Sequence, residues 1–430
     1  MKTTIKTLCG MLAMLTFTAC SSNTDEAIND TPIWHVTLTA SMDDEATRAL
    51  SEGTGNRIIA GFAENDVVVV VDADGNTVGT LKAKTAGAST TLEGTISGVS
   101  ASDVLTFRYR SATANYDNQN GTLPGIADNQ DYAEGTLTVT ATSPDLTLSS
   151  NHVTLAAKQS ITKFSFTNGT NPITVKTFRI AAAGLVQSIA KDGVETEGEV
   201  TCTLSEAASN AYVALRNNTN AKQIYTFTVR DNAGNWYTGT KKANLANGNN
   251  YTTSVALTQL PTLTGESAVG TIGMIDGLPA IVVEINSTKK AIALMNLGAF
   301  WPEDYGEYYT FANKASELPT GWKVPTSEEL FVGSGNTATG GLAYITNIWT
   351  TQHGVNGRKF TIGDNALFLP AGGYYENGSS LTANSTDGYY WSSTTDGDNV
   401  IYLNVDNNIP ATFSILTKED ALTVRPFHDL

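Results

Sequence analysis

The 430-residue chain is poor in cysteine, in histidine and in basic residues. It has three cysteines, four histidines, and 26 lysines and arginines against 42 aspartates and glutamates, for a formal net charge of −16. Nucleic acids and anionic lipid surfaces are polyanions, so an acidic chain is a poor partner for either. We therefore expect no nucleic-acid partner. The four histidines, His35, His152, His353 and His428, lie far apart in sequence without metal-ligand spacing.

No apolar run in the chain is long enough to cross a bilayer as a helix. At the start, Lys2 and Lys6 precede the apolar residues 8–17, and small residues lead to Cys20. This is the pattern of a secretory signal peptide. Its apolar run is about half of the ~20 residues that a spanning helix needs. We predict that residues 1–20 are a signal peptide that does not persist as a membrane anchor, and that the mature net charge is −18, because two lysines leave with it.

The end of this segment, FTAC at residues 17–20, resembles a bacterial lipobox with phenylalanine in place of the usual leucine. The resemblance implies that Cys20 is lipidated on its sulfur, and two or three acyl chains would hold the protein nearly permanently in the outer membrane. The alternative is an ordinary secretory signal with an incidental cysteine. Residues 21–32 form a soluble tether, in which Asp25 and Glu26 resemble the export signal of Bacteroidetes surface lipoproteins. That likeness implies a protein facing the cell exterior.

Removal of Cys9 and lipidation of Cys20 would leave Cys202 alone, so that no internal disulfide could form. Cys202 alternates with Val200 and Leu204, which places the three on one strand face. We interpret it as a small buried hydrophobic residue and not as a nucleophile. Stability must then come from apolar cores, which a chain of this length can supply.

Residues 33–258 alternate apolar and polar residues over short segments that turn residues separate. Threonine and valine dominate these segments, as a half-buried pleated surface favours. The pattern predicts a mainly β fold, and the length favours two sandwiches, at residues 33–157 and 158–258. Residues 259–271 have the composition of a linker. Residues 272–430 differ in character and form a third domain.

This region resembles the fimbrillin-like (Mfa-like) family of Bacteroidales surface lipoproteins. The likeness covers roughly residues 20–258 and is carried by the lipobox, the tether and the segments WHVTLTA, EATRALSE, LSSNHVTLAAKQSITKFSF and GNNYTTSVALTQL. It implies two tandem transthyretin-like β-sandwiches. It also implies a role as a pilus stalk, anchor or tip subunit, or as a free surface lipoprotein.

The same resemblance draws attention to Arg48, in EATRALSE. In polymerising members of the family a trypsin-like protease cuts after an arginine at the corresponding place. The cut removes the first strand and opens a groove for the donor strand of another fimbrillin-like subunit, a form of β-strand addition. The alternative is that Arg48 is a solvated loop arginine.

The third domain contains the segment GWKVPTSEEL at residues 321–330. Thr326 and Glu329 have the spacing of a capping box, which predicts a helix start. Pro325 would fix the approach of the chain, Trp322 would pack at the turn, and Gly333 and Gly335 would end the helix within two turns. Each residue has a structural task. Glu328 and Glu329 are adjacent, so on a helix they would point in different directions and not act as an acid–base pair.

The third domain resembles the Fibrobacter succinogenes major paralogous domain, a branch of the C-type-lectin-like fold. The blocks that carry the likeness are Trp322-Pro325-Glu329, Leu369-Pro370-Ala371-Gly372-Tyr374, Tyr390-Trp391-Ser392-Ser393 and Val424-Arg425-Pro426. It implies a compact α+β domain over residues 272–430 with no established activity. Formylglycine-generating enzymes share this fold, but their copper site needs a cysteine pair, and residues 270–430 contain no cysteine.

The remaining motifs favour neither a metal site nor an enzyme. Two segments are oxygen-rich, DADGN at residues 72–76 and TTDGDN at residues 394–399. Both stand between strand-like segments, which favours hairpin turns and not calcium-binding loops. SITK at residues 160–163 and STKK at residues 287–290 match Ser-x-x-Lys without the later Lys-Thr-Gly. We expect no catalytic residue, no metal and no cofactor.

Four of the six tryptophans and many tyrosines lie in the third domain. They form either a core, which the alternation in YYWSST favours by burying one face, or a platform on which sugar rings stack. The overall prediction is a surface lipoprotein with an adhesive or binding role, as a pilus accessory or tip subunit. Its alternative is a stand-alone glycan-binding protein for nutrient capture. The expected ligand is a glycan or a protein, from the host or from the diet, and the sequence is compatible with each.

Overall fold

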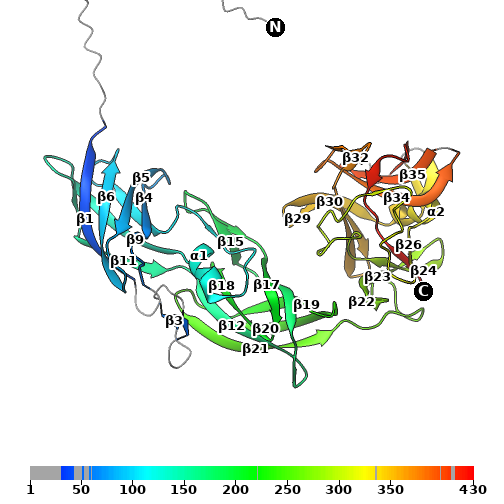
Figure 1. The fold of residues 1–430 in the computed structure, drawn as a ribbon, viewed down its shortest axis with the longest axis horizontal. Coiled ribbons are helices and arrows are strands. Elements are labelled where there is room, and N and C mark those ends of the chain that lie inside the picture. The colour runs from blue at the N-terminus through cyan, green and yellow to red at the C-terminus, as the bar shows by residue number, and fades with distance from the viewer. Residues whose placement is uncertain are drawn as a thin grey trace, which may run out of the picture.

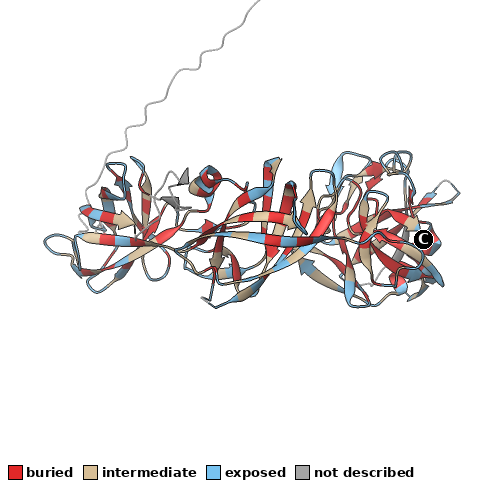
Figure 2. Ribbon diagram, turned by 90° about the horizontal axis from the view of Figure 1, so that it is seen from below, coloured by how far each residue is buried: buried red, intermediate tan, exposed pale blue. Residues whose placement is uncertain are grey.

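The computed structural model is mainly β, as the alternation predicted, and has only short helices in its described part. It describes residues 31–42, 51–52, 58–59, 61–219, 221–334, 337–397, 399–407 and 412–430. Cys20 and Arg48 lie outside the described residues. Three bodies follow one another along an elongated molecule, with β1 (Ile33–Met42) at one end and the C-terminal body at the other (Figures 1 and 2).

The first body is a sheet that closes on itself. Its strands run in the order β10-β9-β11-β1-β6-β5-β4-β7, and β7 pairs again with β9. A small separate pair is formed by β2 (Ser51–Glu52) and β3 (Ile58–Ile59). The other strands of the closed sheet are β4 (Val67–Val71), β5 (Thr77–Ala83), β6 (Ser89–Ser97), β7 (Val104–Tyr109), β9 (Ala133–Ala141), β10 (Thr147–Leu148) and β11 (His152–Ala157).

Strand β1 lies inside this sheet and not at an edge. It pairs antiparallel with β6 along nearly its whole length and parallel with β11 at its end. Val36, Leu38 and Ala40 alternate into the core. The His152 ring of β11 lies 3.0 Å from the hydroxyls of both Thr39 and Ser41. The first core therefore depends on side chains from the N-terminal strand.

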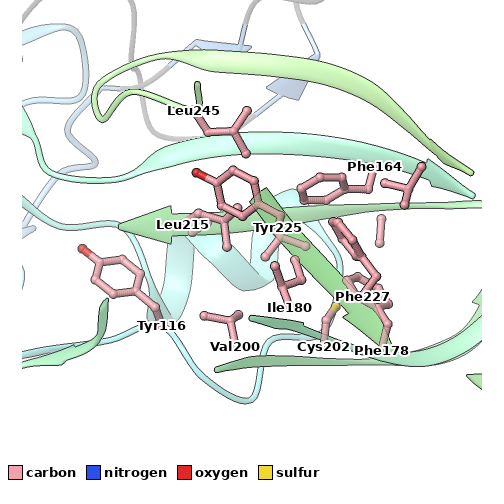
Figure 3. Packing of buried hydrophobic residues seen from close by; sticks show 14 of the residues in the cluster. Tyr116, Phe164, Phe178, Ile180, Val200, Cys202, Leu215, Tyr225, Phe227 and Leu245 are labelled. Atoms are coloured by element: carbon pink, nitrogen blue, oxygen red, sulfur yellow. The ribbon is translucent and has the colours of Figure 1, made fainter. Parts of the chain in front are cut away.

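The second body has one large sheet in the order β16-β15-β18-β12-β21-β20-β19-β14-β17. Its core packs aromatic rings such as Phe164, Phe178 and Phe227, and the fully buried Cys202 lies beside the last two (Figure 3). Burial also raises the pKa of the Cys202 thiol well above its ordinary value. The strands are β12 (Ser160–Asn168), β13 (Asn171–Pro172), β14 (Val175–Ala181), β15 (Leu185–Ile189), β16 (Glu195–Glu197), β17 (Val200–Ala208), β18 (Asn210–Asn217), β19 (Gln223–Asp231), β20 (Trp236–Ala243) and β21 (Asn250–Gln259).

Residues 114–132 fall inside the range predicted for the first sandwich, yet they pack in the second core. The segment begins with β8 (Ala114–Asn115), which pairs with β15, and includes α1 (Leu123–Asn129). Its apolar side chains, from Tyr116 to Tyr132, lie among those of the second body, because only that core covers them. Sequence alternation could not reveal this crossing, since it shows which face is buried but not against what.

Gln119 fixes the crossing segment in place. Its side chain is almost fully buried, and its Nε2 donates to the carbonyls of Tyr116 and Ala214, both at 2.7 Å. Its Oε1 accepts from the Ala214 amide at 2.9 Å, while its backbone exchanges hydrogen bonds with Thr201 and Thr203. The side chain of Gln119 thus bonds β18 and its backbone bonds β17, so this residue connects the two strands.

A partly buried ion cluster lies at the junction of the first two bodies. Arg108 of β7 lies 3.1 Å from Glu134 of β9, and Lys158 lies 3.3 Å from the same carboxylate. The Tyr132 hydroxyl donates to Glu134 at 2.6 Å. Burial acts to raise the pKa of Glu134, but Tyr132, Lys158 and Arg108 outweigh it and leave that pKa below its ordinary value. Arg108 also donates to the carbonyl of Lys191 in the second body.

The C-terminal body combines several small sheets around three apolar clusters. Its main sheet runs β22-β23-β24-β38-β26, and three-stranded sheets are formed by β29-β30-β31 and β34-β35-β36. The strands and helices of this body are β22 (Ile272–Ile275), β23 (Leu278–Ile285), β24 (Thr288–Ala293), β25 (Tyr309–Thr310), β26 (Trp322–Lys323), α2 (Ser327–Leu330), β27 (Val332–Ser334), β28 (Thr337–Gly340), the 3₁₀ turn η1 (Leu342–Tyr344), β29 (Asn347–Gln352), β30 (Val355–Ile362), β31 (Asn365–Pro370), β32 (Tyr374–Glu376), β33 (Ser380–Thr382), β34 (Asp387–Asp396), β35 (Asn399–Asp406), β36 (Thr412–Leu416), β37 (Ala421–Leu422) and β38 (Phe427–Asp429).

Arg425 lies at the centre of this body with its side chain fully buried. Its guanidinium donates to the carbonyls of Ala293, at 3.1 Å, and Phe368, at 2.9 Å. Burial lowers the pKa of Arg425 to about 10, and Tyr390 partly opposes that shift. The arginine of the Val-Arg-Pro block therefore holds together chain segments that are distant in sequence.

No helix in the described part of the chain combines the length and the apolar character that crossing a membrane would require.

Replacing Gln119 by alanine should lower the free energy of unfolding by about 1–3 kcal/mol, because the Ala214 amide and two carbonyls would lose a buried partner. Denaturant unfolding measures this loss. The matched control is Gln259→Ala, whose side chain is exposed at the end of β21 and which should leave the midpoint unchanged. Equal effects of the two substitutions would contradict the role given to Gln119.

Candidate functional site

The GWKVPTSEEL segment is a structural corner. Helix α2 begins with the predicted capping box: the Thr326 hydroxyl accepts from the Glu329 amide at 3.2 Å, and Glu329 Oε2 accepts from the Thr326 amide at 2.8 Å. The prediction that glycines end the helix was wrong, because the helix ends at Leu330 and the buried Phe331 is already extended. Trp322 is buried among the side chains of β23 and β24, and its Nε1 donates to the carbonyl of Asp276 at 3.2 Å.

Glu329 is held by two lysines, which gives it a structural role. Lys290 and Lys323 each lie 3.0 Å from its Oε1. Burial acts to raise the pKa of Glu329, but the Thr326 amide and both lysines outweigh it and hold that pKa below its ordinary value. Glu328 is exposed while Glu329 is buried, so the adjacent carboxylates point apart as predicted.

Most of the large aromatic side chains of the C-terminal body are core. The expectation that YYWSST buries one face was wrong, because neighbouring Tyr390 and Trp391 are both fully buried. Tyr390 packs in one apolar cluster and Trp391 in another, so β34 passes between two cores. The Tyr390 hydroxyl donates to the carbonyl of Pro370 at 2.6 Å, and Trp391 Nε1 donates to that of Tyr309 at 2.6 Å.

A group of half-buried tyrosines remains, and we name it the tyrosine face: Tyr305, Tyr308 and Tyr375. The rings of Tyr308 and Tyr375 meet edge to face with centroids 4.9 Å apart, whereas Tyr374, on the other side of β32, packs with Tyr389 against an apolar cluster. Burial raises the pKa of Tyr308 to about 12, and its hydroxyl donates to the carbonyl of Gly372. These rings are partly exposed and hold each other in place, as a stacking surface for a ligand requires.

Gly372 is needed where the tyrosine face meets the backbone. A Cβ at this position would lie 3.0 Å from the Tyr308 hydroxyl and 3.1 Å from the Tyr305 ring. The glycine of the Leu-Pro-Ala-Gly block therefore lets two of these rings approach the chain closely. The block itself could be found in the sequence, but its relation to Tyr305 and Tyr308 could not.

The second and C-terminal bodies are joined by a seam of aromatic and charged side chains. Arg179 of β14 forms an ion pair with Glu303, and its guanidinium stacks 3.8 Å from the centroid of the Trp301 ring. Trp236 of β20 meets Trp301 edge to face at 5.3 Å. Arg230 lies 4.5 Å above the Phe300 ring. The sequence left the tryptophans of the third domain, Trp301 among them, between a core and a ligand platform, and no pattern in the chain signals the partners of Trp301 in the second body.

The β29–β30 hairpin adds a further contact across the seam. His353, in the turn of this hairpin, lies 3.4 Å from the Glu199 carboxylate of the second body. The hairpin tip points toward the second body in Figure 1. Cavities lie on both sides of the turn, one of about 620 Å³ lined by Glu197 and Glu199, and one of about 450 Å³ lined by Arg179 and Glu303.

The two oxygen-rich loops are hairpin turns, as predicted. Asp72 accepts from the backbone amides of Asp74, at 3.0 Å, and Asn76, at 2.8 Å, in the turn between β4 and β5. Residues Asp396 and Asn399 pair where β34 returns into β35. Among the described residues, no three side chains of histidine, cysteine, aspartate or glutamate are placed to hold a metal ion together.

Neither a family model nor a curated protein matches the chain. Several solved structures resemble it. A candidate cell adhesion protein from Bacteroides ovatus is 14% identical over 52% of this chain and 95% of its own, with a TM-score of 0.30. The tip fimbrial protein Mfa3 from Porphyromonas gingivalis is 11% identical over 53% and 98%, with a TM-score of 0.28. A fimbrial protein from Bacteroides ovatus is 10% identical over 91% and 99%, with a TM-score of 0.24. At these TM-scores the likenesses carry no argument about function.

The ion pairs of Glu329 should stabilise the protein at neutral pH and be lost at acidic pH. Its pKa is lower in the folded chain than the unfolded value of about 4.3, so its contribution is complete above that value and is lost as the pH falls through the folded pKa. We expect Glu329→Gln to destabilise the protein more at about pH 6 than at about pH 2.5.

Denaturant unfolding of the wild type and the variant at both pH values measures this difference. Glu328→Gln is the matched control. Glu328 is the exposed neighbour of Glu329, so its substitution should change the free energy of unfolding by a small amount that is the same at both pH values. A Glu329→Gln effect that does not depend on pH would contradict the assignment.

Proposed function

We propose that the chain is a cell-surface lipoprotein that is anchored in the outer membrane through Cys20 and holds an adhesive or ligand-binding C-terminal body away from the cell. The seam at Trp301 is the observation that carries this proposal. An ion pair, a stacked guanidinium and two tryptophan rings fix the C-terminal body to the second body. The C-terminal body lies at the opposite end of the molecule from β1, so a fixed junction to it suits a protein that presents its last domain outward (Figure 1).

In this proposal the first two bodies are transthyretin-like sandwiches of the fimbrillin-like kind, and the C-terminal body is a C-type-lectin-like domain. The crossing segment and the Glu134 cluster would stiffen the rod between the anchor and the C-terminal body. The large C-terminal body would obstruct stacking at its end, which favours a pilus tip or accessory subunit over a stalk subunit.

Assembly with other fimbrillin-like subunits would use the place that β1 occupies. Val36, Leu38 and Ala40 fill the first core from this strand, which separates β6 from β11. Cleavage after Arg48 and loss of β1 would uncover an apolar groove that a donor strand from another subunit could fill.

The second candidate function is glycan capture at the cell surface. The tyrosine face favours it, because its rings are partly exposed and those of Tyr308 and Tyr375 contact each other. Sugar rings commonly stack on such aromatic surfaces. In this role the protein would act alone, without polymerising.

The lipid anchor is tested by Cys20→Ser expressed in a Bacteroidetes host. We expect the variant to leave the membrane fraction, because residue 20 then has no thiol to carry the acyl chains. Protease added to intact cells should degrade the wild-type protein. Cys9→Ser is the control and should stay anchored. Full membrane association of Cys20→Ser, or a wild-type chain that external protease cannot reach, would refute the proposal.

Processing is tested by N-terminal sequencing of protein shed from the surface. If the chain assembles as proposed, the mature protein should begin at Ala49, and Arg48→Ala should abolish this start and the formation of polymers. Arg57→Ala, the other arginine of this region, should leave both unchanged. A wild-type chain that begins only at Cys20 would count against cleavage and favour the stand-alone role.

A further inference from the structure

The strands by which the chain enters and leaves the second body are neighbours and run parallel. Strand β12 follows the first body directly, and β21 leads into residues 260–271 and the C-terminal body. Eight residue pairs join the two strands, from Ile161 with Asn250 to Asn168 with Leu257. The strands lie side by side in Figure 1. The covalent path from the first body to the C-terminal body therefore enters through β12 and leaves through β21.

Tension between the two ends of the chain would act along these strands. At roughly 3.3 Å per residue and about 4.8 Å between neighbouring strands, Ile161 and Leu257 lie about 23 Å apart lengthwise and only one strand spacing apart sideways. The pull would therefore slide one strand past the other. Because the hydrogen bonds of a parallel pair are evenly spaced along it, sliding strains all of them together. A pull on both strands from the same end would instead break the bonds one after another.

The core of the second body opposes such sliding. Phe164 and Phe166 of β12 lie in this core, as do Val255 and Leu257 of β21. Lys163 is half-buried and lies on the opposite face of β12. Because side chains alternate along a strand, a slip of one residue would move Lys163 into the core and the phenylalanines out of it. The pair therefore cannot yield by a one-residue slip, and it holds until many contacts break together.

The first body has the same arrangement at its own entry and exit. The chain enters through β1 and leaves through β11, which pair in parallel from Thr39 with His152 to Met42 with Leu155. Strand β1 also pairs antiparallel with β6 along nearly its whole length. A pull on the start of β1 against the end of β11 would again slide the strands past each other. Tension would therefore load both bodies in the same direction relative to their strands.

We infer that the first two bodies form a rod that resists tension, in which the parallel pairs β1–β11 and β12–β21 keep the bodies folded while a ligand held by the C-terminal body is pulled away from the cell. This role rests on the proposed function, because a chain anchored through Cys20 and bound at its other end is stretched between the two points. A freely diffusing ligand would exert no tension. The rod therefore suits a ligand that is fixed to another surface, which favours adhesion over the capture of soluble nutrients.

The test is to pull the purified chain from Ser21 onward in optical tweezers, through handles on pairs of introduced cysteines. Cys202 is the only other thiol in residues 21–430 and is fully buried, so that coupling selects the introduced pair. The handle positions are exposed and lie at the two ends of the β12–β21 pair. They are Thr154→Cys before β12, Thr170→Cys after it, Asn249→Cys before β21 and Gln259→Cys at its end.

Three double variants compare the directions of pull. The variant with handles at residues 154 and 259 loads the strands from opposite ends. The variants with handles at 154 and 249, and at 170 and 259, load both strands from the same end. The opposite-end variant should unfold at a higher median force than either same-end variant at the same pulling rate, because forced unfolding follows the unfolding barrier along the direction of pull.

Both substitutions of the opposite-end variant recur in the same-end variants, which controls for their effect on stability. Denaturant unfolding should give the three variants the same midpoint. Equal unfolding forces in all three, or the lowest force in the opposite-end variant, would overturn the inference. The measurement uses no membrane, so its failure would leave the lipid anchor standing. Retention of Cys20→Ser in the membrane fraction would refute the anchor and leave the measured forces unchanged.

Discussion

The stacking of Arg179 on Trp301 is the interaction on which the arrangement of the far half of the molecule depends. It brings a charged strand residue of the second body against an aromatic ring of the C-terminal body, and the ion pair with Glu303 fixes its direction. A guanidinium over an indole ring is stabilising and becomes more so as water is removed. The orientation of the C-terminal body, and the cavity that both bodies line, follow from this contact.

Buried polar groups recur at each place where distant parts of the chain meet. Gln119 joins two strands of the second body, Glu134 joins the first and second bodies, and Arg425 holds the centre of the C-terminal body. Each would be unfavourable alone, because burying a polar group costs free energy unless it is hydrogen-bonded. Because each of these groups is paired, it specifies which chain segments meet. Apolar contacts alone specify such pairings less precisely.

Local features were predictable from the sequence, and the contacts between bodies were not. The alternation around Cys202 predicted a buried strand position, and the spacing of Thr326 and Glu329 predicted the capping box, because both depend on near neighbours in the chain. Alternation predicts that only one of Tyr390 and Trp391 is buried, but both are, because β34 has a core on each side. The cavity unites Asp117 with Glu303, and no local pattern encodes a partner so far along the chain.

The crossing segment also limits how this protein can be divided or recombined. A cut near residue 157 would leave the first piece with Tyr116, Leu123 and Ile126 facing water, and would take from the second piece the residues that connect β17 to β18. Neither fragment would be a self-sufficient unit. The first two bodies therefore act as one unit in any division of the chain, and a terminal domain exchanged after residue 258 would have to provide new partners for Arg179 and Trp236.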